Sequence, residues 1–270
     1  AATSGSNSNP QQEATSRISR SSSLRDAMRA WIRSATDEGI AISSMTLSPL
    51  VTTGFSVAPS IRLAANALRP AADASGRVDL EALRENLDET VAGLMLTNPN
   101  TLGLFEDNIR QVADIVHQKG GLVYGDGANM NAIMGIVNMG ELGIDVLHLN
   151  LHKTFSSPHG GGGPGSGPVC VRKHLEPFLP VPRVIKKKGK YELSEDLPDS
   201  MGKVHAFYGN IGVMIRAYSY IMSMGPDGLK KASQLAVLNA AYIKDNLKGT
   251  FHLPYDRPCM HECVFSDKLQ

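Results

Sequence analysis

Two residues able to take part in Schiff-base chemistry, Asp126 and Lys153, each follow a short apolar run that is typical of a buried strand. A lysine that forms a Schiff base must be partly desolvated, and it works beside a group that keeps the pyridine nitrogen of its cofactor protonated. A carboxylate at position 126 can fill that second role. The crossover 127–143 is long enough to bring the two strands side by side. By spacing alone, however, the plain alternative is favoured: Asp126 caps a helix and Lys153 is a surface lysine.

Histidines and glycines surround the lysine in the sequence. His148, His152, His159 and His261 can each act as an acid or base, but most histidines are structural, so only His152 and His159 are kept as candidates. The four glycines 160–163 lack Cβ atoms, so their backbone can approach a phosphate or a long swinging arm closely. A flexible gate is the alternative, and the sequence does not separate the two.

The elements that must position these residues alternate between strands and helices. Asp79 is expected to cap a helix through Leu87, and a second helix with apolar positions from Phe105 to Val116 ends at Gly120. Strands are expected at 92–96, 122–124, 144–149 and 168–171. This alternation predicts an α/β fold with a mostly parallel sheet, whose ligands gather at the carboxyl ends of the strands.

The flanking regions differ in character. Residues 1–24 are rich in Ser, Asn and Gln and are expected to be disordered, whereas the structure of 25–75 cannot be assigned. We divide the rest into a cofactor-domain portion, 76–190, and a portion of helices, 191–270. Helices 213–224 and 229–247 are expected on either side of a break at Gly225 and Pro226, and a strand at 263–265.

Composition narrows the classes of partner. The chain has 270 residues, 42% of them hydrophobic, with 27 basic against 26 acidic residues, so we expect a globular fold and no nucleic-acid ligand. The basic run 186–190 is interpreted as a solvated loop. Three cysteines fit a reducing compartment, and Cys259, His261, Glu262 and Cys263 lack the second pair that a zinc site needs. No stretch approaches the ~20 apolar residues of a membrane span.

Several motifs are highly specific when taken together. They are YGDGANMNA at 124–132, LHLNLHKTF at 147–155 and PHGGGGPG at 158–165, with LMLTNPNTLGLF upstream at 94–105 and PFLP, FYGN and CMHE at 177–180, 207–210 and 259–262. They closely resemble the P-protein family of glycine decarboxylase, also called glycine dehydrogenase (aminomethyl-transferring). The resemblance covers roughly residues 76–266.

The resemblance implies an aspartate-aminotransferase-like fold (fold type I) with an incomplete C-terminal domain. It implies pyridoxal 5'-phosphate held covalently at Lys153, with Asp126 at the pyridine nitrogen, Ala128 against one ring face and His152 lining the site. Thr97 and Asn100 are candidates for contacts with the cofactor's phenolic oxygen or the substrate carboxylate, and a plain turn role is the alternative.

The reaction implied by the resemblance is decarboxylation of glycine, with transfer of the aminomethyl group to the lipoyl arm of the H-protein. A second P-protein subunit or half would complete a homodimer or a heterotetramer, located in the cytoplasm of a bacterium or in the mitochondrial matrix of a eukaryote. Two alternatives remain: another fold type I enzyme, such as an aminotransferase or a cysteine desulfurase, or a non-catalytic partner subunit. The last alternative would have no need of Lys153.

The chain departs from the family pattern upstream of Gly76. The family's Ala-His-Gly-Thr-Asn stretch, which supplies a histidine that stacks on the cofactor ring, has no counterpart, and no histidine precedes His117. The glycine-rich phosphate-binding turn expected further upstream is also unidentifiable. The abrupt change suggests a frameshift or a mispredicted gene start, and we expect this polypeptide by itself to lack decarboxylase activity.

Overall fold

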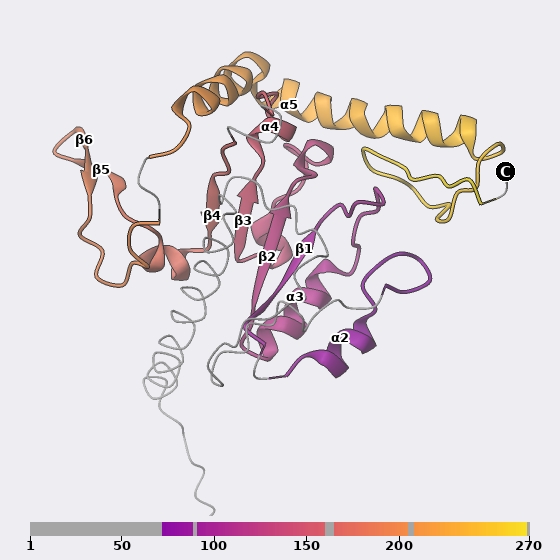
Figure 1. The fold of residues 1–270 in the computed structure, drawn as a ribbon, viewed down its shortest axis with the longest axis horizontal. Helices are drawn as coiled ribbons and strands as arrows, with labels where there is room; N and C mark the ends of the chain where they lie inside the picture. The colour runs from indigo at the N-terminus through magenta and orange to yellow at the C-terminus, as the bar shows by residue number, and fades with distance from the viewer. Residues whose placement is uncertain (1–71, 89–90, 160–164, 205–207, 269–270) are drawn as a thin grey trace, which may run out of the picture.

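A four-stranded sheet forms the centre of the molecule. The computed structural model describes residues 72–88, 91–159, 165–204 and 208–268. Three parallel strands, β1 (Gly93–Thr97), β2 (Leu122–Gly127) and β3 (Val146–Leu149), lie in the order of the sequence, and β4 (Val169–Val171) pairs antiparallel with β3 (Figure 1). The mostly parallel sheet predicted from the sequence is confirmed. The expected disorder of 1–24 and the glycines 160–163 lie outside the described residues, as does the unassigned segment 25–75 except for its last four residues, 72–75.

Two amphipathic helices cover one face of the sheet next to β1 and β2. They are α2 (Leu80–Asn86) and α3 (Ile109–Gln118) (Figure 1). The side chain of Asp79 accepts hydrogen bonds from the backbone N–H groups of Glu81 and Ala82, so the predicted cap of α2 is confirmed. Side chains of both helices and of the sheet form one buried core, which includes Leu83, Val112, Val116 and Val123.

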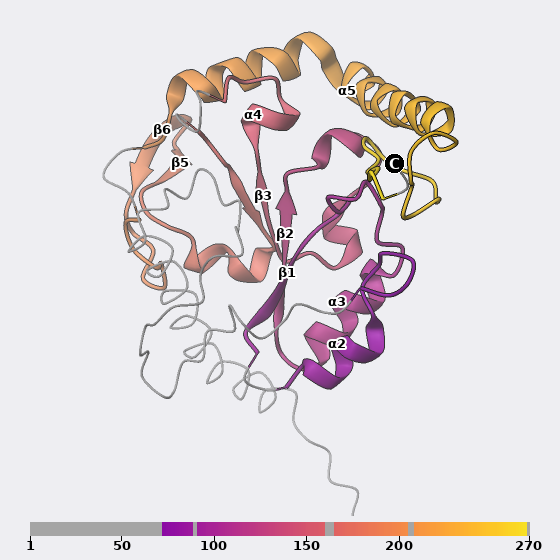
Figure 2. The ribbon, with the colours of Figure 1, turned by 45° about the vertical axis from the view of Figure 1, so that its right-hand side comes forward.

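A long helix, α5 (Ile211–Leu247), arches past the carboxyl ends of the parallel strands (Figure 2). Gly225 interrupts it with φ 62°, so the break predicted at Gly225 and Pro226 is present as a kink between two helical halves. In the second half, the hydroxyl of Ser233 donates to the carbonyl of Asn131, which lies in the short 3-10 helix η1 (Met130–Ala132). The helix therefore bridges over the edge of the sheet where ligands are expected.

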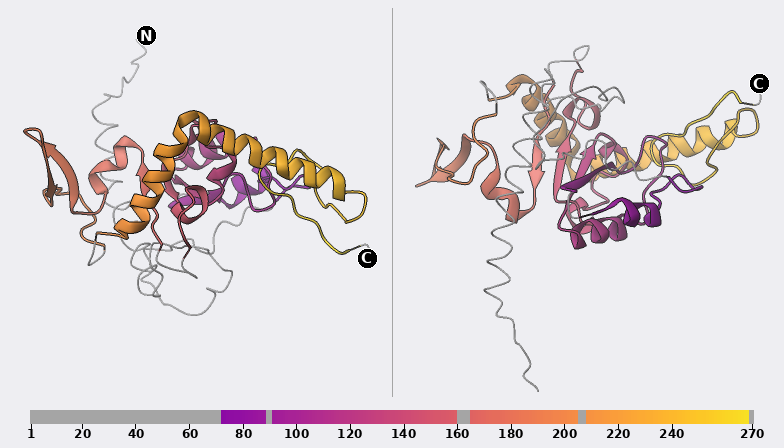
Figure 3. Two further views of the ribbon diagram at one scale, coloured as in Figure 1. Left: turned by 90° about the horizontal axis from the view of Figure 1, so that it is seen from above. Right: turned by 60° about the horizontal axis from the view of Figure 1, so that its bottom comes forward.

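A two-stranded hairpin projects from the body of the molecule, formed by β5 (Arg183–Lys187) and β6 (Lys190–Ser194) (Figure 3). The prediction of a loop for the basic run was therefore wrong, although its lysines are exposed as expected. The physical reason lies in the connection, because Lys188 and Gly189 both have positive φ, of 49° and 80°. Two such residues form the tight turn that suits the twist of a hairpin.

The last described segment corrects another prediction. Residues 263–265 form no strand, and the nearest pairing is a single bridge between His252 and Ser266. Instead the segment folds back along α5, where the thiol of Cys263 lies 3.9 Å from the carbonyl of Ala240. Without a neighbouring strand edge, the apolar residues there have no ladder to join.

Two further 3-10 helices complete the fold, η2 (Met139–Leu142) before β3 and η3 (Lys173–Phe178) after β4. None of the described helices combines the length and the apolar character needed to cross a bilayer.

Candidate active site

The candidate site begins as a row of three side chains across the sheet. Thr97 is in register with Asp126 on the next strand, and Asp126 is in register with His148 on the strand after that. Partners in a parallel register point to the same face of a sheet. The row lies at the carboxyl ends of β1, β2 and β3, which is the edge where α/β sheets bind ligands.

Asp126 is held as a carboxylate by its neighbours. Its Oδ1 accepts a hydrogen bond from the backbone N–H of Ala128 at 2.9 Å and lies 3.1 Å from His148 Nε2. Burial raises the pKa of Asp126, but the contact with His148, the Ala128 N–H and the charge of Lys153 together outweigh it. The net pKa therefore lies below its ordinary value. A carboxylate kept ionised in this way can hold a proton on a cofactor nitrogen.

His148 is a site residue that the sequence analysis set aside. Its Nδ1 lies 2.9 Å from the hydroxyl of Tyr124, and the two rings are 5.6 Å apart between centroids. Burial, and then the charge of Asp126, raise the pKa of Tyr124 to about 12. One signal in the sequence could have indicated His148: it is a histidine inside an otherwise apolar strand, Val146–Leu149. Because side chains alternate along a strand, His148 points to the same face of the sheet as Val146.

Lys153 lies on a single turn of helix, α4 (Leu151–Thr154), directly after β3. Leu151 anchors this turn against Val213 and Ala217 at the start of α5, and the hydroxyl of Ser157 lies 3.4 Å from the carbonyl of Val213. The structure thus brings Lys153 to the same edge as Asp126, near enough for its charge to lower the pKa of that carboxyl. The lysine side chain is exposed, so the described residues leave the space around it open.

His152 and His159, the two histidine candidates, lie together. Their rings meet edge to face with centroids 4.9 Å apart. Burial lowers the pKa of His152, and the charges of His159 and Lys153 lower it further. A neutral imidazole next to the lysine can accept or relay a proton.

Three residues next to the lysine along the chain have unpaired polar atoms. Among the described residues, the Oδ1 of Asn150, the Nδ1 of His152 and the Oγ1 of Thr154 are buried without a hydrogen-bond partner. Buried polar groups are nearly always paired, so three within five residues of chain mark a place where a polar ligand fits. The residues present around Lys153 and Asp126 therefore fit a cofactor that carries an aldehyde, a ring nitrogen and several oxygens.

The remaining predicted residues fall into two groups. Thr97 belongs to the site row, and Ala128 follows Asp126 with its backbone N–H turned to the carboxylate. Asn100 does not face this row. Its Oδ1 accepts from the N–H groups of Leu102 and Leu104, and its Nδ2 donates to the carbonyl of Gly76, so its contacts favour the alternative, a turn role.

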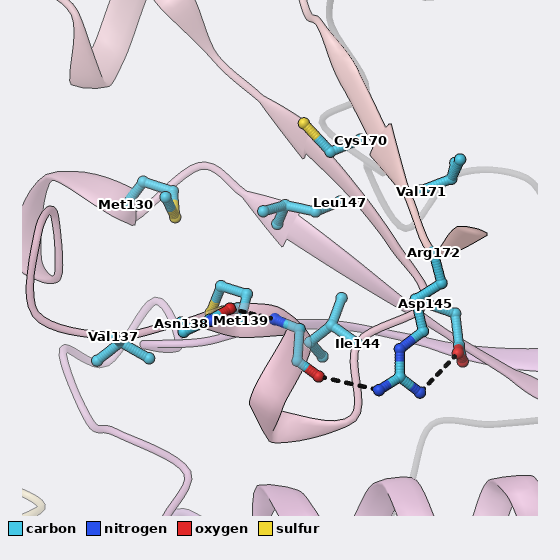
Figure 4. Close-up of a pocket in the computed structure, with 11 residues that line it drawn as sticks. Met130, Val137, Asn138, Met139, Ile144, Asp145, Leu147, Cys170, Val171 and Arg172 are labelled. Atoms are coloured by element: carbon cyan, nitrogen blue, oxygen red, sulfur yellow. Dashed lines mark hydrogen bonds and ion pairs between the residues drawn. The ribbon is translucent and has the colours of Figure 1, made fainter. Parts of the chain in front are cut away.

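A cavity of about 430 Å³ lies on the other face of the sheet (Figure 4). Leu147 and Cys170 line it, and Leu147 alternates with His148 along β3, so the cavity opens away from the site row. At its rim Arg172 donates to the carbonyl of Gly140 and pairs with Asp145. Neither Lys153 nor Asp126 lines this cavity. The candidate active site is therefore placed at the carboxyl ends of the strands, where these two residues lie.

Comparison with known proteins gives the class of this fold. Residues 62–194 match the family Aminotransferase class-V, whose members are pyridoxal-phosphate enzymes of fold type I, so the fold class expected from the sequence is confirmed. A solved structure, the apo cysteine desulfurase from Thermococcus onnurineus NA1, aligns with 66% of this chain and 44% of its own at 20% identity and a TM-score of 0.45.

The particular relatives are more specific. The chain is 63% identical over 191 residues to a probable glycine dehydrogenase (decarboxylating) subunit 2 of Caldanaerobacter subterraneus subsp. tengcongensis, covering 71% of this chain and 39% of the relative. It is 56% identical over 195 residues to the protein of the same name from Bacillus licheniformis, covering 72% and 40%. The predicted resemblance to glycine decarboxylase P-proteins is thereby confirmed. The chain spans about two fifths of the length of these curated relatives.

Proposed function

We propose that the described site binds pyridoxal phosphate and serves the decarboxylation of glycine, with the aminomethyl group passing to the lipoyl arm of an H-protein. The observation that carries the proposal is the convergence of Lys153 and Asp126 at one sheet edge, together with the unpaired polar atoms of Asn150, His152 and Thr154 in the same stretch of chain as the lysine. The names of the relatives support the choice of glycine as the substrate.

Each residue has a role set by its chemistry. Lys153 supplies the amine that binds the cofactor's aldehyde, and the ionised Asp126 holds a proton at the pyridine nitrogen. When bound, pyridoxal phosphate supplies an electron sink for the pair of electrons left when carbon dioxide departs from glycine. Ala128 offers a small side chain beside the ring position, and His152 can hold or release a proton next to the lysine.

The proposed partners follow from the same relatives. Their name, subunit 2, describes those proteins as one part of a larger enzyme. We propose that this chain, too, works with a second subunit and receives the lipoylated H-protein at its site. No separate observation favours a different pyridoxal-phosphate reaction.

The test uses the relative as a host. Residues 76–266 of this chain would replace the matching segment of the Caldanaerobacter subunit 2, which would then be combined with its partner subunit and lipoylated H-protein. Exchange of glycine's carboxyl group with labelled carbon dioxide is expected, and Lys153→Ala in the same chimera should abolish it. A chimera that folds and binds pyridoxal phosphate but catalyses no exchange would refute glycine as the substrate.

A further inference from the structure

A chain of three polar side chains leads from the core of the sheet to Asp126. The hydroxyl of Tyr124 lies 2.9 Å from His148 Nδ1, and His148 Nε2 lies 3.1 Å from Asp126 Oδ1. The side chains of His148 and Asp126 are only 10% and 16% exposed. Apart from its close approach to Asp126, Nε2 has no hydrogen-bond partner among the described residues. The imidazole thus has one nitrogen for the tyrosine and one for the carboxylate.

The two contacts of the imidazole decide where its proton lies. A tyrosine hydroxyl that donates to Nδ1 leaves the ring proton on Nε2, which faces the carboxylate. Such an Nε2–H favours the ionised form of Asp126 and limits rotation of its carboxylate, as outer partners do for many functional ligands. The second oxygen of the carboxylate is thereby left for a ligand.

We propose that Tyr124 and His148 are positioning residues for Asp126: the tyrosine fixes the tautomer of the histidine, and the histidine fixes the charge and orientation of the carboxylate. This inference rests on the proposed function, because it assigns Asp126 to a cofactor nitrogen. It extends that proposal by two residues that act through Asp126.

The full 270-residue chain also contains a matched control. His117 Nε2 on α3 lies 2.7 Å from Asp145 Oδ2, which makes a second histidine–aspartate pair, between a helix and the residue directly before β3. Asp145 is at the start of β3, at the opposite end of the strand from His148, and it also accepts from the N–H of Val123. Replacing His117 therefore perturbs an aspartate contact without touching the row that contains Asp126.

The experiment measures the carboxyl pKa of Asp126 and the imidazole tautomer of His148 by NMR, in the cofactor-free full chain. Among the described residues, the charged and titratable groups that interact with Asp126 are His148 on β3, Lys153 on α4 and Tyr124 on its own strand. His148→Phe should raise the Asp126 pKa toward its ordinary value, whereas His117→Phe should not change it. Tyr124→Phe, which keeps the ring, should redistribute the proton of His148 between its two nitrogens.

A second readout is the binding of pyridoxal phosphate to the same proteins. His148→Phe should weaken binding roughly tenfold, as loss of an outer partner does elsewhere, and His117→Phe should leave it unchanged. An unchanged Asp126 pKa in His148→Phe, or an unchanged tautomer in Tyr124→Phe, would overturn the inference. Failure of every protein to bind the cofactor would refute the proposed function instead, and the NMR measurements would still decide the role of the pair.

Discussion

The carboxylate of Asp126 and the imidazole of His148 lie on paired strands, with Oδ1 3.1 Å from Nε2. The close approach of these two side chains depends on Gly127, the residue after Asp126, where no side chain fits. A Cβ added at Gly127 would collide with the backbone oxygen of His148. Since that oxygen belongs to the strand itself, only a separation of β2 from β3 could relieve the collision.

Gly127→Ala should therefore destabilise the protein by roughly 1–3 kcal/mol, the usual cost of overpacking, and should also loosen the Asp126 contact. Urea unfolding measures the first effect. Gly249→Ala is the control, because a Cβ there meets no atom within 4 Å. Equal stability of the two variants would contradict the close packing of these strands.

Alkaline pH tests the burial of Tyr124. Its pKa is raised to about 12, so the neutral phenol is favoured by folding. The resulting stability is fully present below the unfolded pKa, near 10, and is lost as pH rises toward 12. As pH is raised, the absorbance of the phenolate should show a titration step at high pH that is absent from Tyr124→Phe. Tyr218→Phe, an exposed position on α5, should keep the step. A high-pH step that survives Tyr124→Phe would contradict the assignment.

The contacts that hold the helical turn carrying Lys153 can be tested at two positions of α5, one buried and one exposed. Val213 is 4% exposed and packs on Leu151, whereas Ile215 is 59% exposed. Val213→Ala should lower the free energy of unfolding by about 2 kcal/mol and weaken pyridoxal-phosphate binding, because α4 loses its anchor. Ile215→Ala should change neither quantity appreciably. Similar effects from the two substitutions would show that α4 is positioned by other contacts.

Asp126→Asn separates cofactor attachment from catalysis. An amide cannot stabilise the protonated pyridine nitrogen, so covalent binding at Lys153 should persist while decarboxylation falls by roughly a hundredfold or more. The measurement is exchange of labelled carbon dioxide into glycine in the chimera described above. Exchange at the unmodified rate would remove Asp126 from the mechanism.

Local signals in the sequence predicted much of this fold. The cap at Asp79, the four strands of the central sheet and the break at Gly225 depend on neighbouring residues, and each is present in the structure. The hairpin was not predicted because a run of lysines is typical of a solvated loop, whereas the turn depends on the positive φ of Lys188 and Gly189.

The candidate site was only partly predictable. Lys153 and Asp126 could be paired because each lies at or shortly after the end of a strand. The role of His148 depends instead on the register of β2 against β3, which pairs residues 22 positions apart and which no local pattern reveals. The prediction of a strand at 263–265 was wrong for a related reason. A strand needs the edge of a neighbouring strand to pair with, and the residues of the segment itself do not specify one.

The most direct measurement is the location of the cofactor bond. The full chain would be incubated with pyridoxal phosphate, reduced with borohydride and digested, and the labelled peptide identified by mass spectrometry. The account predicts a pyridoxyl group on Lys153 and a corresponding absorbance band that is absent from Lys153→Ala. A label on another lysine, or an undiminished label in Lys153→Ala, would contradict the central claim.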